Sequence, residues 1–135
     1  MIGDASGFYV PEKDVFWPNY FESLETYCKS IRKLAALSAC RGALCHNGVV
    51  NGDLYRYFIK ALMATDAYHN EMMERLEKGE DPVEIALEKA HWVETLTDIQ
   101  TLEVMHRLAK LLITRSRTKA GKEKLVSIPR LIECV

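Results

Sequence analysis

The sequence lacks any apolar run that approaches the roughly 18 uninterrupted residues needed to cross a bilayer, so we expect no membrane contact. Its first 14 residues have neither a basic start nor an apolar core, so we expect no secretory signal there. Hydrophobic residues make up 48% and charged residues 27% of the 135 positions, close to the globular average. These shares exclude a disordered chain, a collagen-like fibre and a mucin-like stalk, and with the chain length they predict one globular domain. The lack of an export signal predicts a cytoplasmic location.

Cysteine is also scarce, and no two cysteines form a C-x-x-C pair. The four cysteines are Cys28, Cys40, Cys45 and Cys134. Without an export signal we expect their thiols to be reduced. A zinc site formed by Cys40, Cys45 and His46 is an alternative, but structural zinc sites usually use two matched ligand pairs, and no second pair follows in this sequence.

Apolar residues recur every three or four positions and predict an all-α fold. One helix is expected to begin near Asn19, which forms a capping-box pattern with Glu22, and to weaken near Gly42. A second is expected over residues 53–78 and a third over residues 82–114, with a tight turn between them. At 1.5 Å per residue these two rods are about 39 and 50 Å long, too long for one small globule. We therefore predict an antiparallel bundle of three long helices that dimerisation completes.

The segments between and around these helices divide the chain. Residues 1–17 are expected to form an irregular N-terminal arm that lies across the body or a partner, residues 18–114 the bundle, and residues 115–135 a basic linker and an apolar C-terminal tail. Residues 46–53 contain two Asn-Gly pairs, which are hairpin signals when strands flank them. Because helical patterns flank them here, a helix stop and restart is preferred.

Carboxylates and histidines give a candidate metal site. Antiparallel pairing about the turn at residues 79–81 brings residue i level with residue 160 − i, so that His69 lies level with His91 and Glu71 with Lys89. The pairs Asp66-x-x-His69 and Glu88-x-x-His91 then lie at one height, as in helical bundles that hold iron, manganese or zinc. The candidate ligands are Asp66, His69, Glu88, His91 and Glu94. The preferred alternative is a core His69 and a solvated His91, with no cofactor.

Three motifs are absent, namely the phosphate loop G-x-x-x-x-G-K-[ST], the dinucleotide loop G-x-G-x-x-G and the nucleophile elbow G-x-S-x-G. Two partial resemblances remain. The carboxylates Glu71, Glu74, Glu94 and Asp98 resemble the E-x-x-E…E-x-x-D pattern of MazG-like nucleotide pyrophosphohydrolases, which implies Mg²⁺ binding and nucleotide hydrolysis. The segment from Arg41 to His46 resembles the R-x₄₋₆-H signature of HEPN-type ribonucleases, which implies RNA cleavage by that Arg and His. Neither covers enough of the chain to assign a family.

Charge is distributed unevenly along the chain. The net charge of −1 combines −7 over residues 1–105 with +6 over residues 106–135. The basic part can bind a polyanion or the acidic body of a second copy, and solvated basic helix ends are the commonest alternative. The candidate nucleic-acid contacts are Arg107, Lys110, Arg115, Arg117, Lys119, Lys122 and Lys124.

Weak catalytic patterns beside strong packing patterns favour a non-enzymatic function. We expect a small protein-interaction or regulatory module that acts through a surface of the bundle, as a homodimer. The alternatives are a metal-dependent helical-bundle enzyme with a carboxylate and histidine site, and a nucleic-acid-binding protein that uses the basic C-terminal part.

Overall fold

The computed structural model describes residues 1–118 of the chain. Within them, the helices are α1 (Leu24–Ala35), α2 (Leu54–Glu77), α3 (Pro82–Glu94) and α4 (Leu102–Arg117), with a short 3-10 helix η1 (Pro11–Lys13). Strands β1 (Phe8–Val10) and β2 (Val15–Trp17) form one antiparallel hairpin, and β3 (Arg41–Ala43) and β4 (Val49–Asn51) form another. The fold is therefore mixed α/β, and the prediction of an all-α bundle of three long helices is wrong.

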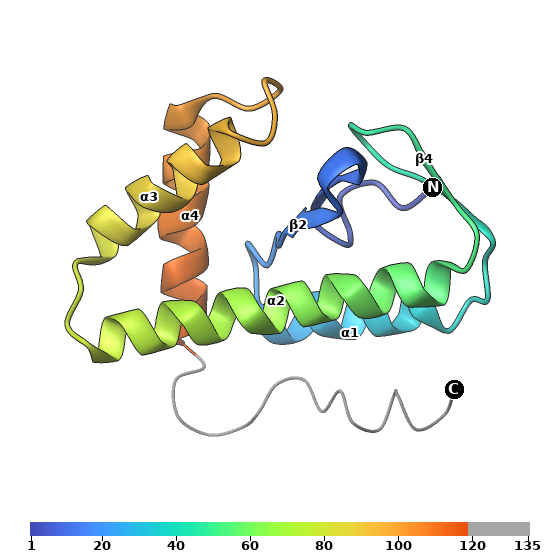
Figure 1. Cartoon of the computed structure of the whole chain (residues 1–135). Coiled ribbons are helices and arrows are strands. Elements are labelled where there is room, and N and C mark those ends of the chain that lie inside the picture. The colour runs from blue at the N-terminus through green and yellow to red at the C-terminus, as the bar shows by residue number, and fades with distance from the viewer. Residues whose placement is uncertain (119–135) are drawn as a thin grey trace.

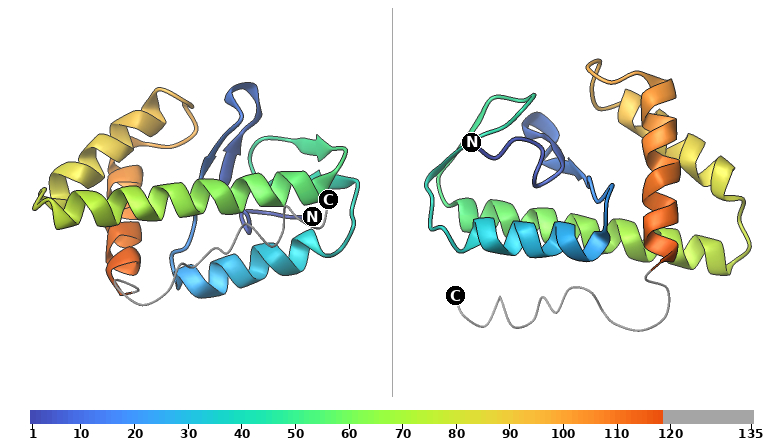
Figure 2. Two further views of the ribbon diagram at one scale, coloured as in Figure 1. Left: turned by 60° about the horizontal axis from the view of Figure 1, so that its bottom comes forward. Right: turned by 180° about the vertical axis from the view of Figure 1, so that it is seen from behind.

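The long helix α2 organises the molecule (Figure 1). Helix α1 packs along the N-terminal half of α2, and both hairpins lie beside that half (Figures 1 and 2). Helices α3 and α4 pack against each other at its C-terminal half. Among the helices within residues 1–118, none combines the length and the apolar composition that crossing a membrane requires.

The expected irregular arm is the β1–β2 hairpin. Aromatic and β-branched residues face each other across it, with Phe8 opposite Trp17 and Tyr9 opposite Phe16, whose rings stack at 4.4 Å. The chain reverses through η1 and Asp14, which has a positive φ of 50°. The hairpin packs onto the body, as expected, and Trp17 is completely buried. Gly7 permits this contact, because a Cβ there would lie 2.4 Å from the Trp17 carbonyl oxygen.

The expected helix stop and restart at residues 46–53 is the β3–β4 hairpin. Gly48 supplies a positive φ of 80° at the turn, and the Leu44 amide donates to the Gly48 carbonyl at 2.8 Å. The strands that flank the turn have only three residues each, so they show no alternation that the sequence analysis could recognise. The Asn47-Gly48 pair therefore marks a hairpin turn, and the prediction of a helix stop and restart at this position is wrong.

Helix α1 is shorter than predicted at both ends. It begins after Ser23, whose hydroxyl accepts the Thr26 amide at 3.3 Å, rather than at the Asn19 capping box. It ends at Ala35, and Ser38 then adopts a left-handed φ of 50°. Helix α2, in contrast, has nearly the predicted bounds, and its predicted apolar line is buried from Leu54 to Met72.

The predicted tight turn between α2 and α3 is confirmed. Gly79 follows the C-cap with a φ of 82°, and its amide donates to the Leu76 carbonyl at 3.0 Å, while the Glu80 amide donates to Arg75 at 3.1 Å. These are the two hydrogen bonds of a Schellman motif. Asp81 then caps α3 by accepting the Val83 amide at 2.8 Å.

The expected rod over residues 82–114 is broken at residues 95–101 into α3 and α4. Threonine hydroxyls at the two ends of this segment form hydrogen bonds with backbone groups of the helices. The Thr95 hydroxyl donates to the Trp92 carbonyl at 2.6 Å, and the Thr101 hydroxyl accepts the Val104 amide at 3.4 Å. The break lets α4 fold back onto α3. It buries the far half of the predicted rod within one chain, so the length argument for dimerisation no longer holds.

Candidate functional site

An open groove of about 460 Å³ lies between the β1–β2 hairpin, α2 and α3. Residues of α2 form its floor, while residues of β2 and α3 form its walls; Figure 1 shows how these three elements are placed. Its lining includes the aromatic side chains of Phe16, Tyr68 and Trp92, so we call it the aromatic groove. Its volume lies within the range of about 300–1,000 Å³ that is usual for ligand pockets.

The groove floor is one face of α2. It consists of Lys60, Met63, Ala64, Ala67, Tyr68 and Glu71. Successive members are one or three positions apart, so they share one face of the helix, beside the buried line that faces the core. At 1.5 Å per residue, the floor is about 17 Å long.

A paired lysine occupies the α3 wall. The side chain of Lys89 is only 13% exposed, and its Nζ atom donates to Glu71 Oε2 at 2.6 Å. The same ammonium lies 5.4 Å from the centre of the Tyr68 ring and 5.8 Å from that of Trp92, within cation–π range. The predicted level pairing of Glu71 with Lys89 across the turn is thus confirmed.

A second ion pair closes the hairpin side of the groove. Asp14 accepts Lys60 Nζ at 2.6 Å and the Tyr9 hydroxyl at 2.8 Å. The hydrogen bond from Lys60 is the main cause of a lowered pKa of Asp14, and the bond from Tyr9 adds to it. Burial, and then the hydrogen bond to Asp14, raise the pKa of Tyr9 to about 12. Lys13, next to Asp14, donates to the Thr95 carbonyl at 2.5 Å and ties the hairpin tip to the end of α3.

Two large apolar side chains of the groove remain open to solvent. Met63 is 47% exposed and Trp92 is 36% exposed. The hydroxyl of Tyr68 is buried and has no hydrogen-bond partner among the described residues. The groove therefore offers uncovered apolar area, while its lysines and carboxylates are paired with one another.

The five metal ligands expected from sequence do not converge. Glu88 is held by a two-pronged contact with Arg75, at 2.9 and 2.7 Å, which lowers its pKa. His91 contacts Glu94 at 2.9 Å on an exposed surface. His69 is buried, as expected for a core histidine, and no group of three ligands that includes it or Asp66 is found within residues 1–118.

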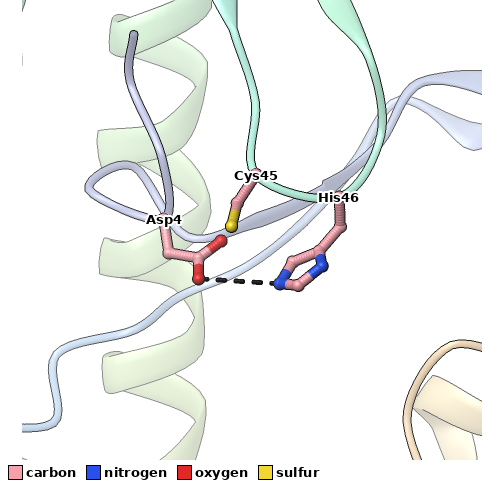
Figure 3. Close-up of side chains that lie close together, drawn as sticks. All are labelled: Asp4, Cys45 and His46. Atoms are coloured by element: carbon pink, nitrogen blue, oxygen red, sulfur yellow. Dashed lines mark ion pairs between the residues drawn. The ribbon is translucent and has the colours of Figure 1, made fainter.

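A different trio converges instead. Within the described residues, Asp4, Cys45 and His46 are the one group of three such side chains whose ligand atoms all lie within 4.8 Å of one another (Figure 3). Two of the three, Cys45 and His46, belonged to the zinc alternative considered from sequence. Asp4 takes the place of Cys40 in the group, and no sequence pattern links it to the other two residues.

The residues behind the two family resemblances are engaged elsewhere. Glu71 binds Lys89, and Glu74 binds Lys78 at 2.6 Å. Arg41 donates to Asn51 across the second hairpin at 3.0 Å, so the Arg41–His46 segment lies on a hairpin and not on a helix.

The candidate nucleic-acid contacts lie partly on α4. Arg107, Lys110 and Arg117 are exposed there, whereas Arg115 donates to the Phe21 carbonyl at 2.7 Å. Lys119, Lys122 and Lys124 lie outside the described residues, as does most of the predicted linker and tail.

The groove was missed in the sequence although it left a signal. A second apolar stripe lies beside the core line of α2 and consists of Met63, Ala64, Ala67 and Tyr68. Because one apolar stripe is enough to pack an amphipathic helix against a core, the second stripe indicates another contact surface. The partners of this stripe lie on β2, a strand that was not predicted, and on α3, which was predicted as the first part of a longer helix. No protein-family model matches the chain and no curated protein matches it, so its residues and their geometry carry the functional inference.

Proposed function

We propose that this chain is a non-enzymatic protein-interaction module that binds an apolar segment of a partner protein in the aromatic groove. The observation that carries the proposal is the uncovered apolar area of Met63 and Trp92 on the rim of a preformed groove. Tryptophan, tyrosine and methionine are enriched at the centres of protein interfaces, where burying them contributes most of the binding energy.

The charges of the groove favour an uncharged occupant. Asp14 is paired with Lys60, and Glu71 with Lys89, so the four groups leave no net charge. A charged ligand would have to break one of these pairs and lose its own hydration. An apolar segment would instead bury Met63 and Trp92 and leave both ion pairs intact.

The length of the groove favours a peptide. An extended strand rises about 3.3 Å per residue, so about five residues match the floor of about 17 Å. The partner can be a second copy of this chain, so the expected homodimer is one outcome of the test.

The proposal is also consistent with the cytoplasmic location expected from the sequence, because exposed thiols stay reduced in that compartment.

Selection of peptides from a displayed random library tests the proposal. We expect the selected peptides to share apolar or aromatic residues and to bind the purified full chain. Met63→Glu should weaken that binding by at least about tenfold, or about 1.4 kcal/mol. Val83→Glu is the matched control, because Val83 is an equally exposed apolar residue on α3 that does not line the groove.

Two results would contradict the proposal. One is a library that yields no binder above the background of an unrelated protein. The other is a set of binders whose affinity Met63→Glu and Val83→Glu change equally. Light scattering of the same three proteins detects self-association, and a dimer that only Met63→Glu dissociates would identify the partner as a second copy.

A further inference from the structure

The N-terminal segment brings Asp4 beside the turn of the second hairpin. The Ile2 amide donates to the Ala43 carbonyl at 2.8 Å, and Gly3 forms a parallel bridge with Leu44. Because parallel neighbours advance in the same direction, the residues after this bridge, Asp4 and Cys45, come level with each other. Residues that are 41 positions apart in sequence thus meet through backbone pairing.

The turn that carries Cys45 and His46 is held on both sides. Asn47 donates to the Tyr9 carbonyl and so ties the turn to the first hairpin. The His46 ring packs against Phe8, with 5.9 Å between the ring centres. These contacts hold the backbone of the turn against the first hairpin, while the side chains of Asp4, Cys45 and His46 are exposed.

The three side chains converge on one point. His46 Nε2 lies 3.7 Å from Asp4 Oδ2, and all three ligand atoms lie within 4.8 Å of one another (Figure 3). Zn–N, Zn–O and Zn–S bonds of about 2.0–2.3 Å at tetrahedral angles separate the ligand atoms by about 3.4–3.6 Å. A small closure of the three side chains would therefore give a tetrahedral site.

We propose that Asp4, Cys45 and His46 bind a divalent transition metal ion of the zinc class. A carboxylate oxygen, a thiolate sulfur and an imidazole nitrogen form a mixed donor set that suits Zn²⁺ better than Mg²⁺ or Ca²⁺, which prefer oxygen ligands alone. The charges of the carboxylate and thiolate balance those of the ion. Three protein ligands also leave a fourth position open, as in exchangeable zinc sites.

A small pocket adjoins the Asp4 and His46 side chains of the cluster. It has a volume of about 90 Å³ and is lined by Asp4 and His46 as well as by Trp17 and Gln100. Trp17 is 1% exposed, and its indole nitrogen is a buried donor with no partner among the described residues. The pocket is large enough for a water molecule, which the metal ion would accept as its fourth ligand.

Cobalt titration of the reduced full-length protein tests the site. Co²⁺ is the probe, because a cobalt–thiolate bond gives a charge-transfer band in the near ultraviolet, and Zn²⁺ should then displace it. We expect the band to saturate at one equivalent. Cys45→Ser should abolish it, and Asp4→Asn and His46→Gln should each weaken binding at least about tenfold, since even losses outside the ligand sphere cost 10–100-fold.

Cys40→Ser is the matched control, because Cys40 is also an exposed free cysteine beside the second hairpin. It should leave the band and the affinity unchanged. The proposal is overturned if a tenfold excess of Co²⁺ gives no band, if the band survives in Cys45→Ser, or if Cys40→Ser removes it as completely as Cys45→Ser. Circular dichroism of each variant separates loss of a ligand from loss of the fold.

Discussion

His69 shows how one buried residue links pH to stability. It lies on the core face of α2, where the apolar line of the sequence predicted it, and its Nδ1 atom has no partner among the described residues. Burial lowers the pKa of the imidazole below its usual 6.5, and the nearby Asp66 offsets part of this effect. The folded protein therefore binds a proton at His69 less readily than the unfolded chain does.

This difference sets the sign of a testable pH effect. The contribution of His69 is fully present above pH 6.5 and is lost as the pH falls below 6.5 toward the lowered pKa of the folded state, because protonation then favours the unfolded chain. We expect His69→Gln to lose less stability than the wild type between about pH 7.5 and pH 5.5. Urea unfolding at both pH values measures this, and an equal loss in the two proteins would contradict it. His91→Gln, at an exposed site, is the control.

At the scale of an element, the turn between α2 and α3 depends on one glycine. Gly79 has a φ of 82°, and a Cβ at this position would meet no atom within 4 Å. The cost of Gly79→Ala is therefore backbone strain alone, about 1–2 kcal/mol, less the gain from a stiffer unfolded chain. We expect a net loss of about 1 kcal/mol by urea unfolding. Glu77→Ala, at the exposed end of α2, should change stability by less than about 0.5 kcal/mol, and equal effects of the two variants would refute the assignment.

The elements that sequence reasoning predicted are those with strong local signals. Helix α2 has a long apolar line, and the Gly79–Asp81 turn carries a glycine and a cap at fixed offsets. The elements that were not predicted depend on weaker local signals or on contacts between segments distant in sequence. Strands of three residues are stabilised by packing onto α2 and by cross-strand rings such as Tyr9 and Phe16, which periodicity does not record. The break after Glu94 depends on threonine hydroxyls that compete with the helix backbone.

The two candidate sites were missed for a related reason. The aromatic groove joins α2 to β2 and α3, and the Asp4, Cys45 and His46 cluster joins the N-terminal segment to the second hairpin. Both arise where segments distant in sequence meet, so they follow from the hairpins and not from any motif. The sequence supplied Cys45 and His46 as neighbours, but only the Gly3–Leu44 bridge identifies Asp4 as their third partner.

At the scale of the whole molecule, α4 is tied back to the segment that precedes α1. The Tyr20 hydroxyl and the Ser116 hydroxyl form a hydrogen bond of 2.7 Å across 96 positions, and both residues are completely buried. Arg115 donates to the Phe21 carbonyl beside it. These contacts connect the C-terminal end of α4 to the segment before α1, so the α3–α4 pair is joined to the rest of the molecule by more than α2.

The coupling free energy between the Tyr20 and Ser116 hydroxyls can be measured by a double-mutant cycle. Ser116→Ala leaves the Tyr20 hydroxyl buried without a partner, which should cost about 1–3 kcal/mol in urea unfolding. Tyr20→Phe together with Ser116→Ala removes both polar groups, so the double variant should lose less than the sum of the single losses. Ser30→Ala on α1 is the control, because the Ser30 hydroxyl donates to the carbonyl of the exposed Thr26 at 2.9 Å, and it should change stability by less than about 0.5 kcal/mol. Additive losses would mean that the two hydroxyls do not interact.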